Sequence, residues 1–271
     1  PDLRNPTDWE AWRFVNGQER LSGDDVIASL PIAEPIACWR AAMVLINSNR
    51  YDEARSFLLR AQLTNDLDLD IAAKSASVLI TVLEARILHL NTETQGSRLY
   101  IRALLGYLDE VRTRKIKTLF TLEVEMRIHI ALSFAYQSTA EFDAVCLHAS
   151  QTMVLANDLN MPFAYSFGEV QYSIGMAAQG RISDTVYYIG KLLEKPALNE
   201  RVKLGHEIYQ AIQVFNLGDY QHAIQLLQKA SFHNSHPEAV TCTVHLLGLI
   251  AGYEHHTKPV STQYDWYKSY E

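Results

Sequence analysis

The sequence predicts an all-α protein made of stacked antiparallel helix pairs. Apolar residues recur at intervals of three and four, as in Leu58, Leu59 and Leu63, which is the period of a helix face. Glycine and proline, which interrupt helices, are few at 12 and 8 in 271 residues. A third observation, a recurring segment of turn and helix, indicates an internal repeat.

The helical pattern runs nearly from end to end with short connections, and short connections predict antiparallel neighbours. Gly17 can end the first helix, and Pro162 and Pro237 suit first-turn positions. The expected helices cover about residues 7–16, 23–30, 35–48, 51–63, 69–91, 97–114, 117–138, 141–157, 162–179, 182–194, 198–216, 220–232 and 236–254.

Composition and charge argue against several classes of protein. A content of 48% hydrophobic residues is enough for a substantial core, whereas a net charge of -7 makes nucleic acid an unlikely partner. The cysteines Cys38, Cys146 and Cys242 lie far apart, so they predict a reducing compartment and no disulfide framework. No apolar run approaches the length of a membrane span, and the first residues do not resemble a signal peptide. We therefore expect a cytoplasmic protein with no membrane partner.

The internal repeat is seen by aligning an aromatic or apolar residue that follows a turn. The intervals from 142 to 182 and from 182 to 220 are 40 and 38 residues, and the interval from 51 to 142 is about two repeats, divided by a turn near residues 91–97. Five helix pairs result, with a period near those of helical solenoids. The aligned residues are Tyr51 in NRYDEARSFLLRA, Phe142 in AEFDAVCLHAS, Ile182 in GRISDTVYYIGKLL and Tyr220 in GDYQHAIQLLQKA.

Small residues in these segments suit close packing of the two helices within a pair. We expect Ala42 and Ala54 in the first pair, and Ala211 and Ala223 in the fifth, to let the backbones approach. Larger side chains would fill the space against the next pair. One pair alone could not bury both of its apolar faces, so stacking is required for stability.

At these residues the sequence resembles the tetratricopeptide repeat family, over about residues 35–232. NRYDEARSFLLRA also matches, except that Asn49 stands where the family favours Gly. The two weaker segments carry Val145 and Thr185 at the position where the family prefers Ala. The periods also resemble the longer-helix repeats of large bacterial transcription regulators. The segment LGDYQHAIQLLQKA matches the second half of a unit at Gly218, Tyr220, Ala223, Leu227 and Ala230.

The resemblance implies a right-handed α-solenoid in which the first helix of each pair lines a concave groove that binds a peptide or another protein. Lys, Arg and Asn that clamp a terminal carboxylate in some family members are absent from the counted positions, so we predict no carboxylate clamp. The alternative is that the same apolar stripes are ordinary core. Counting back from each turn places in the groove Trp39, Met43, Ile46, Ile130, Phe134, Val170, Ile174, Ala177, Ile208, Ile212 and Phe215, with Asn47 and Asn216 as candidates for holding a peptide backbone or as simple helix-end residues.

The two ends of the chain differ from the repeats. Residues 1–34 are expected to form N-terminal capping helices, 35–254 the repeat domain, and 255–271 a polar and aromatic tail or linker. Trp9 and Trp12 lie three apart on one helix face. They either cover the open end of the solenoid or form a second interface, for a partner helix or for a homodimer.

Four groups of residues resemble chemical sites without matching one. The histidines and Cys242 of residues 233–256 do not have the ligand spacing of a zinc site. NDLDLD at 65–70 lacks the glycine of a calcium loop, because Ile71 follows Asp70, and is expected to cap the next helix. RTRKIK at 112–117 is expected to be a solvated helix end, with a local contact to an anion or nucleic acid as the alternative. Cys146 and His148 are two apart, on different sides of a helix. We predict no metal, no cofactor and no catalytic residue.

The sequence thus favours a non-catalytic module that binds a protein or peptide. One alternative is the ligand- or peptide-sensing domain of a bacterial transcription regulator. Another is an all-α enzyme that uses the histidine-rich C-terminal part.

Overall fold

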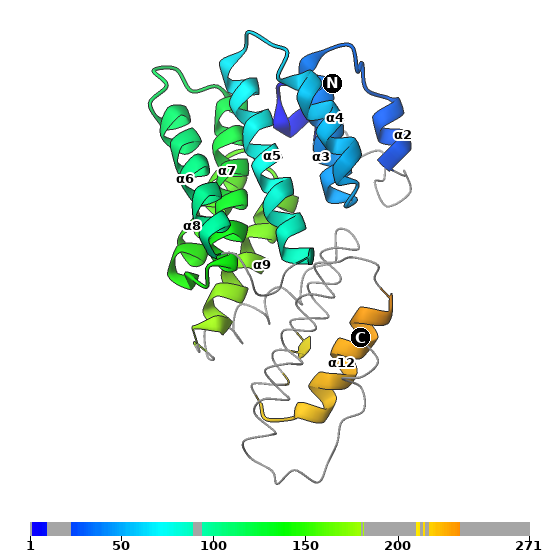
Figure 1. Ribbon diagram of the computed structural model, residues 1–271, viewed down its shortest axis with the longest axis vertical. Coiled ribbons are helices and arrows are strands. Elements are labelled where there is room, and N and C mark those ends of the chain that lie inside the picture. The colour runs from blue at the N-terminus through cyan, green and yellow to red at the C-terminus, as the bar shows by residue number, and fades with distance from the viewer. Residues whose placement is uncertain are drawn as a thin grey trace. The chain divides into compact units, whose positions relative to one another are not determined.

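The chain is all-α, as the sequence predicts. The computed structural model describes residues 2–9, 23–88, 94–179, 181, 210, 211, 214 and 217–233, and these ranges contain no strand. The chain divides into two compact units, residues 1–206 and residues 207–271. The first holds α2 (Gly23–Ala28), α3 (Pro35–Asn47), α4 (Tyr51–Ala61), α5 (Leu67–Leu88), α6 (Thr94–Arg112), α7 (Leu119–Ser138), α8 (Phe142–Asp158) and α9 (Pro162–Ala178), and the second holds α12 (Tyr220–His233) (Figure 1).

The expected helices from 23 to 179 all form, and most of their ends differ from the expectation by a few residues. Of the helix expected at 7–16, residues 7–9 are described and helical. The helices expected at 182–194 and 236–254 lie outside the described residues, as do most residues of 198–216. None of the described helices is long and apolar enough to cross a membrane.

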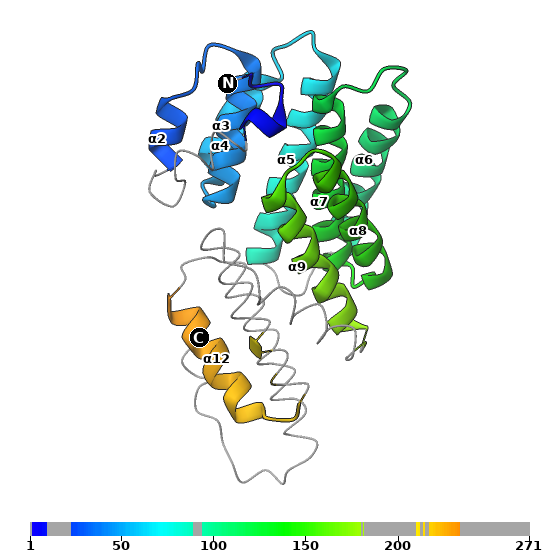
Figure 2. The same ribbon diagram turned by 180° about the vertical axis from the view of Figure 1, so that it is seen from behind.

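Helices that follow one another in the first unit pack together from α2 to α9, and a second set of contacts skips one helix. α5 packs on both α3 and α7, and α7 also touches α9 (Figures 1 and 2). One hydrophobic cluster runs from α3 to α7 and includes the fully buried Trp39, Leu58, Leu83 and Leu104. Burying each such side chain contributes about 1.5–3 kcal/mol, so the helix pairs are held mainly by this shared core.

The turns before the aligned residues have one geometry. Asn49, Ala140 and Gly218 have positive φ angles of 57°, 58° and 84°, each two residues before the aligned residue. In each turn the next backbone N–H bonds to a carbonyl five residues back, from 50 to 45, from 141 to 136 and from 219 to 214. This bond, with a left-handed residue, is the Schellman ending of a helix. The repeat alignment therefore marks a turn that recurs in the structure.

The small residues occupy the places that the repeat pattern predicts. Ala42 and Ala54 are fully buried in the main core cluster, and Ala211 and Ala223 are buried together in the second unit. Their burial fits the close packing of helices that the sequence predicts. The pairing of α8 with α9 uses glycine instead, because a Cβ at Gly175 would lie 2.6 Å from the Cys146 sulfur.

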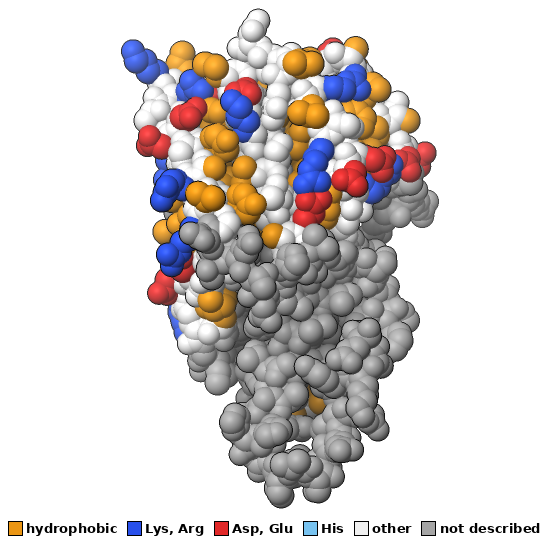
Figure 3. Space-filling model, in the orientation of Figure 1, with side chains coloured by type: hydrophobic (Ala, Val, Ile, Leu, Met, Phe, Trp, Pro, Cys, Tyr) orange, Lys and Arg blue, Asp and Glu red, His pale blue; other side chains and the backbone are white. Residues whose placement is uncertain are grey.

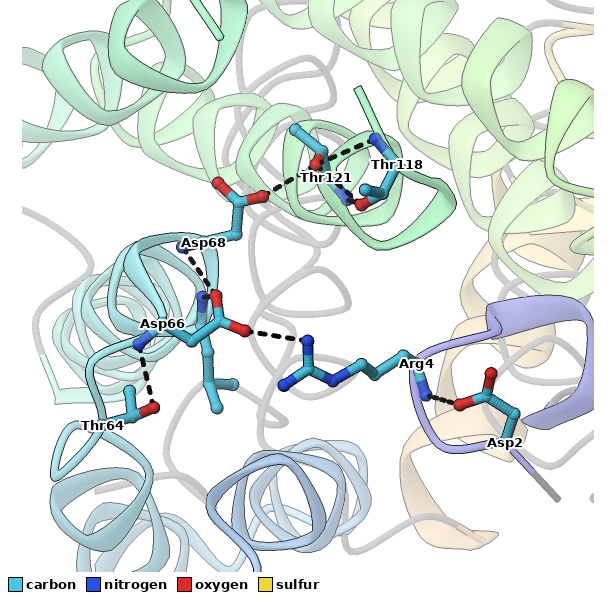
Figure 4. A network of polar contacts seen from close by, with 8 residues as sticks. Asp2, Arg4, Thr64, Asp66, Asp68, Thr118 and Thr121 are labelled. Carbon is cyan, nitrogen blue, oxygen red and sulfur yellow. Dashed lines mark hydrogen bonds and ion pairs between the residues drawn. The ribbon is translucent and has the colours of Figure 1, made fainter. Parts of the chain in front are cut away.

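Acidic and hydroxyl side chains cap the helices whose N-termini meet in Figure 4. Asp66 accepts hydrogen bonds from the backbone N–H groups of Asp68 and Leu69 at 3.1 and 3.2 Å, which confirms that NDLDLD caps α5. Thr118 and Thr121 form a reciprocal capping box at the start of α7. The hydroxyl of Thr121 donates to Asp68 at 2.8 Å, so the two helix starts are tied together.

The basic segment after α6 is largely exposed, as the sequence predicts, and three of its four charges also pair with carboxylates. Arg112 and Lys117 both bind the carboxylate of Glu125, at 2.7 and 3.0 Å. Arg114 lies 3.3 Å from the carboxylate of Asp68. Three of the four positive charges therefore attach the α6–α7 connection to acidic residues of α5 and α7, which the charge pattern alone could not indicate.

Candidate functional site

A small hollow of about 50 Å³, partly open to solvent, lies in the first unit. The described residues that line it come from α3, α5, α7 and α9, and none comes from α4, α6 or α8. We call it the hollow; its described lining is Trp39, Met43, Ile46, Asn47, Ala72, Ser75, Ala76, Leu79, Leu83, Arg127, Ile130, Phe134, Ala164 and Phe167.

The predicted groove residues of α3 and α7 lie together in the structure. The four from α3 and the two from α7, namely Trp39, Met43, Ile46, Asn47, Ile130 and Phe134, all line the hollow. Ile174 and Val170 of α9 are half-buried but do not line it, and the α9 contribution comes from Ala164 and Phe167, which lie nearer the start of the helix. The positions Ile208, Ile212, Phe215 and Asn216 lie outside the described residues.

Sequence reasoning missed the α5 wall and one cation. Five residues of α5, from Ala72 to Leu83, line the hollow, although this repeat was placed by spacing alone. Arg127 of α7, which is not one of the counted positions, also lines it. A periodicity test on α7 would have found Arg127, because it lies one helical turn before the counted Ile130.

The aromatic side chains of the hollow are fixed by ring contacts between helices. Phe134 of α7 and Phe167 of α9 have ring centroids 5.4 Å apart. Trp39 of α3 meets the edge of Phe120 at 5.4 Å and 88°, a favourable T-shaped contact. These contacts set the shape of the apolar wall before any partner arrives, so less order has to be imposed on binding.

A buried ion pair holds the same helices together. Arg40 donates two hydrogen bonds to the carboxylate of Glu123, at 2.5 and 2.6 Å, and both side chains are fully buried. Arg127 also binds Glu123, at 3.3 Å. Burial alone would raise the pKa of Glu123, but Arg40 and Arg127 outweigh it and the pKa is lowered. The carboxylate is therefore charged, and α3 and α7 are locked beside the hollow.

The N-terminal residues 2–9 are bonded to the same Arg40 and to two other parts of the first unit. The guanidinium of Arg40 donates to the backbone carbonyl of Leu3 at 3.1 and 3.2 Å, and Thr7 donates to the carbonyl of Leu159, 152 residues away, at 2.8 Å. Arg4 lies 3.1 Å from the carboxylate of Asp66 (Figure 4). Residues 2–9 therefore connect α3, the start of α5 and the α8–α9 turn.

Trp9 belongs to the core and is only 2% exposed. It packs with Val26, Leu30 and residues of α3, and Arg40 lies 5.7 Å from its ring. This placement fits the covering role that was expected for the N-terminal helix and leaves Trp9 no free surface for a second interface. Trp12 lies outside the described residues.

A buried pair of histidines, which the sequence did not single out, joins α7 to α8. Nδ1 of His129 lies 2.8 Å from Nδ1 of His148, and Nε2 of His129 lies 3.0 Å from Arg112. Arginine can only donate, so Nε2 of His129 accepts and its proton is on Nδ1. His129 then donates to His148, whose proton is on Nε2. Both rings are neutral, and Arg112 sets the tautomer of each.

Burial keeps these histidines neutral. Desolvation, with the charges of the partner histidine and Arg112, lowers the pKa of His129 from 6.5 to about 3. Desolvation and Arg112 lower the pKa of His148 from 6.5 to about 4. Cys146 bonds instead to the carbonyl of Tyr172 at 3.7 Å, and burial raises the pKa of its thiol. Cys146 and His148 therefore serve different contacts, as their spacing predicts.

The outer surface carries scattered apolar side chains. In the view of Figure 3 they form short stripes between charged residues. Leu63, Leu147 and Val154 are among the most exposed, and they offer substitution sites away from the hollow. Among the residues that the structure describes, no group of three His, Cys, Asp or Glu could hold a metal ion.

Comparisons with known proteins do not assign a family. No protein-family model matches the chain, and neither the curated proteins nor the solved structures contain a match. The function is therefore argued from the geometry of the hollow.

Proposed function

We propose that the first unit is a right-handed, tetratricopeptide-like solenoid that binds a peptide or a partner helix in the hollow, without catalysis. The observation that carries this proposal is the origin of the described lining residues. They come from α3, α5, α7 and α9, every second helix of the chain. In a stack of helix pairs, this is the pattern expected when the first helix of each pair faces a concave surface.

The packing and the turns support the same arrangement. The lining helices contact one another in order, α3 with α5, α5 with α7 and α7 with α9. The same Schellman turn leads from α3 into α4 and from α7 into α8, as the bonds from 50 to 45 and from 141 to 136 show. The same turn also leads from α8 into α9, with Asn160 at a positive φ of 53° and a bond from 161 to 156, so the repeated neighbour contacts are the stronger support for a stack of helix pairs.

The chemistry of the hollow suits an apolar anchor. Met43, Leu79, Ile130 and Phe134 present aliphatic and aromatic surface, which contributes about 25 cal/mol for each Å² removed from water. Asn47 supplies an amide that can donate and accept at the same wall. A partner would therefore bind across the mouth of the hollow, by covering its apolar edge and by pairing a few backbone groups.

Selection from a random peptide display library tests the proposal. Peptides that bind the native chain should fail to bind Met43→Glu, because the new charge would lie in the apolar wall. Leu63→Glu is the matched control, since Leu63 is 81% exposed and does not line the hollow. Ala76→Leu is a second variant that fills the hollow without adding charge, and it should also reduce binding.

Circular dichroism establishes that each variant is folded before binding is compared. Peptides that bind the folded Met43→Glu and Ala76→Leu variants as tightly as the native chain would refute the proposal. Peptides lost from Leu63→Glu but not from the two hollow variants would move the site to the outer surface.

A further inference from the structure

Residues 2–9 lie on the same helix faces as the lining of the hollow. The guanidinium of Arg40 donates to the carbonyl of Leu3 at 3.1 and 3.2 Å, and Arg40 lies one helical turn before a lining residue of α3. Its partner Glu123 lies one turn before Arg127, which lines the hollow on α7. Figure 2 shows the segment, in dark blue, beside α3 and α5. It occupies the part of the lining helices that adjoins the hollow.

The segment reaches further than a cap on the end of the helix stack would. Trp9 packs in the apolar cluster of α2 and α3, as a cap should. Arg4, however, pairs with Asp66 at 3.1 Å, just before α5 (Figure 4). The hydroxyl of Thr7 donates to the carbonyl of Leu159 at 2.8 Å, in the turn before α9. The contacts therefore extend from α3 past α5 to the start of α9, across the lining helices.

The segment resembles a docked peptide, because its own short-range bonds shape it. The backbone N–H of Asn5 bonds to the carbonyl of Asp2 at 2.9 Å, which closes a turn. The side chain of Asn5 accepts from the backbone N–H of Thr7 at 3.1 Å. The N–H of Trp9 bonds to the carbonyl of Asn5, so residues 6–9 form a capped helical turn. A peptide that holds its own shape loses less freedom on binding.

Arg40 gives this surface a specific requirement for a carbonyl. Its side chain is fully buried, with Nε and Nη2 on the carbonyl of Leu3 and Nη1 and Nη2 on the carboxylate of Glu123. A buried donor without an acceptor is costly, and a guanidinium can only donate. A peptide that replaced residues 2–9 without a carbonyl at this place would leave donors of Arg40 unpaired.

We infer that the surface holding residues 2–9 is a peptide-binding surface that this segment fills in cis, and that its partner is a peptide with the same three groups. These are a main-chain carbonyl for Arg40, a hydroxyl for the carbonyl of Leu159 and, two residues after the hydroxyl, an indole for the apolar cluster of α2 and α3. The inference rests on the proposed function, whose surface it extends. The segment and the partner exclude each other, so residues 2–9 lower the affinity of the surface for its partner.

Binding of a synthetic peptide with the sequence of residues 1–10, blocked at both ends and labelled, tests the inference by fluorescence anisotropy with the full chain. The native chain should bind this probe weakly, because its own segment competes at a high effective concentration. The double variant Arg4→Ala, Thr7→Val removes two contacts of the segment and leaves the surface intact. It should bind the probe at least about fivefold more tightly. Asp8→Asn is the matched control, since Asp8 is exposed on the same segment, and it should bind like the native chain.

A second probe tests whether the peptide docks as residues 2–9 do. This probe carries the Thr7→Val change itself, and it should bind the double variant about fivefold more weakly than the first probe. Equal binding of the two probes, equal binding of the first probe to the native chain and the double variant, or no binding at all would overturn the inference. Circular dichroism checks the fold, and Arg4→Ala alone, at an exposed residue, replaces the double variant if that variant does not fold.

Peptides from the display library separate this inference from the proposed function. If Met43→Glu loses the library peptides, and the probe binds the native chain and the double variant equally, the inference is wrong and the proposed function stands. If the library peptides bind Met43→Glu as tightly as the native chain, the proposed function is wrong. The response of the probe to the double variant then decides the inference by itself.

Discussion

Acid should destabilise the first unit through the histidine pair that joins α7 to α8. The folded chain keeps His129 and His148 neutral, with pKa values well below the ordinary 6.5. Below pH 6.5 the unfolded chain therefore binds more protons than the folded one, and stability falls as the pH falls. The stabilising effect is complete above pH 6.5 and is lost progressively toward the lowered pKa values.

The expected loss follows from the pKa difference. Each histidine that stays neutral in the folded chain lowers the free energy of unfolding by about 2 kcal/mol between pH 6.5 and pH 5. The two histidines together lower it by about 4 kcal/mol. That is a large part of the roughly 5–15 kcal/mol that holds a typical domain folded. The structural reason is that a proton on Nδ1 of His148 would oppose the N–H of His129, and a proton on Nε2 of His129 would oppose Arg112.

Urea unfolding at pH 7 and pH 5, followed by circular dichroism, measures this loss. The double variant His129→Gln, His148→Gln should be less stable at pH 7 and should lose most of the pH dependence, because glutamine does not titrate. His222→Asn is the control, since His222 is an exposed residue of α12. A native chain that loses less than about 1 kcal/mol between the two pH values, or a double variant with the native slope, would refute the reasoning.

Four further substitutions, the last of them a control, test the packing, each by urea unfolding at pH 7. Arg40→Met should cost about 3–5 kcal/mol, because it removes the main partner of the buried Glu123, and a loss under about 1 kcal/mol would contradict the assigned ion pair. Ala140→Gly should stabilise by about 0.5–1 kcal/mol, because it relieves a positive φ of 58°, and destabilisation would count against that turn. Gly175→Ala should cost about 1–3 kcal/mol, because its Cβ would lie 2.6 Å from a buried sulfur. Gly106→Ala is the control and should stabilise the chain, because the space around Gly106 is open. Equal effects of the two substitutions would show that α8 and α9 are less tightly packed.

Local sequence patterns predicted the helices and the turns. Apolar spacing of three and four marks a helix face in the sequence itself, and a glycine or asparagine such as Gly218 or Asn49 marks a left-handed turn. Ala140 takes the same conformation without such a signal, because the surrounding helices impose it. Its turn was found only from its place in the repeat.

The sequence could not predict contacts between distant helices. Arg40 and Glu123 are 83 residues apart, and His129 and His148 are 19 apart on different helices. No spacing rule joins such residues, because their distance is set by the packing of α3, α7 and α8. The walls of the hollow on α3 and α7 were found because both lie a fixed count before a recognised turn, while the α5 wall has no such reference.

The proposed function requires the hollow to be the binding surface. Hydrogen–deuterium exchange of the first unit within the full chain, with and without a peptide selected from the display library, tests it most directly. Binding should slow exchange in the lining segments of α3 and α5 and leave the outer helices α4, α6 and α8 unchanged, because the described lining comes from every second helix. Protection centred on α6 or α8 instead, with none around Trp39 and Met43, would contradict the account.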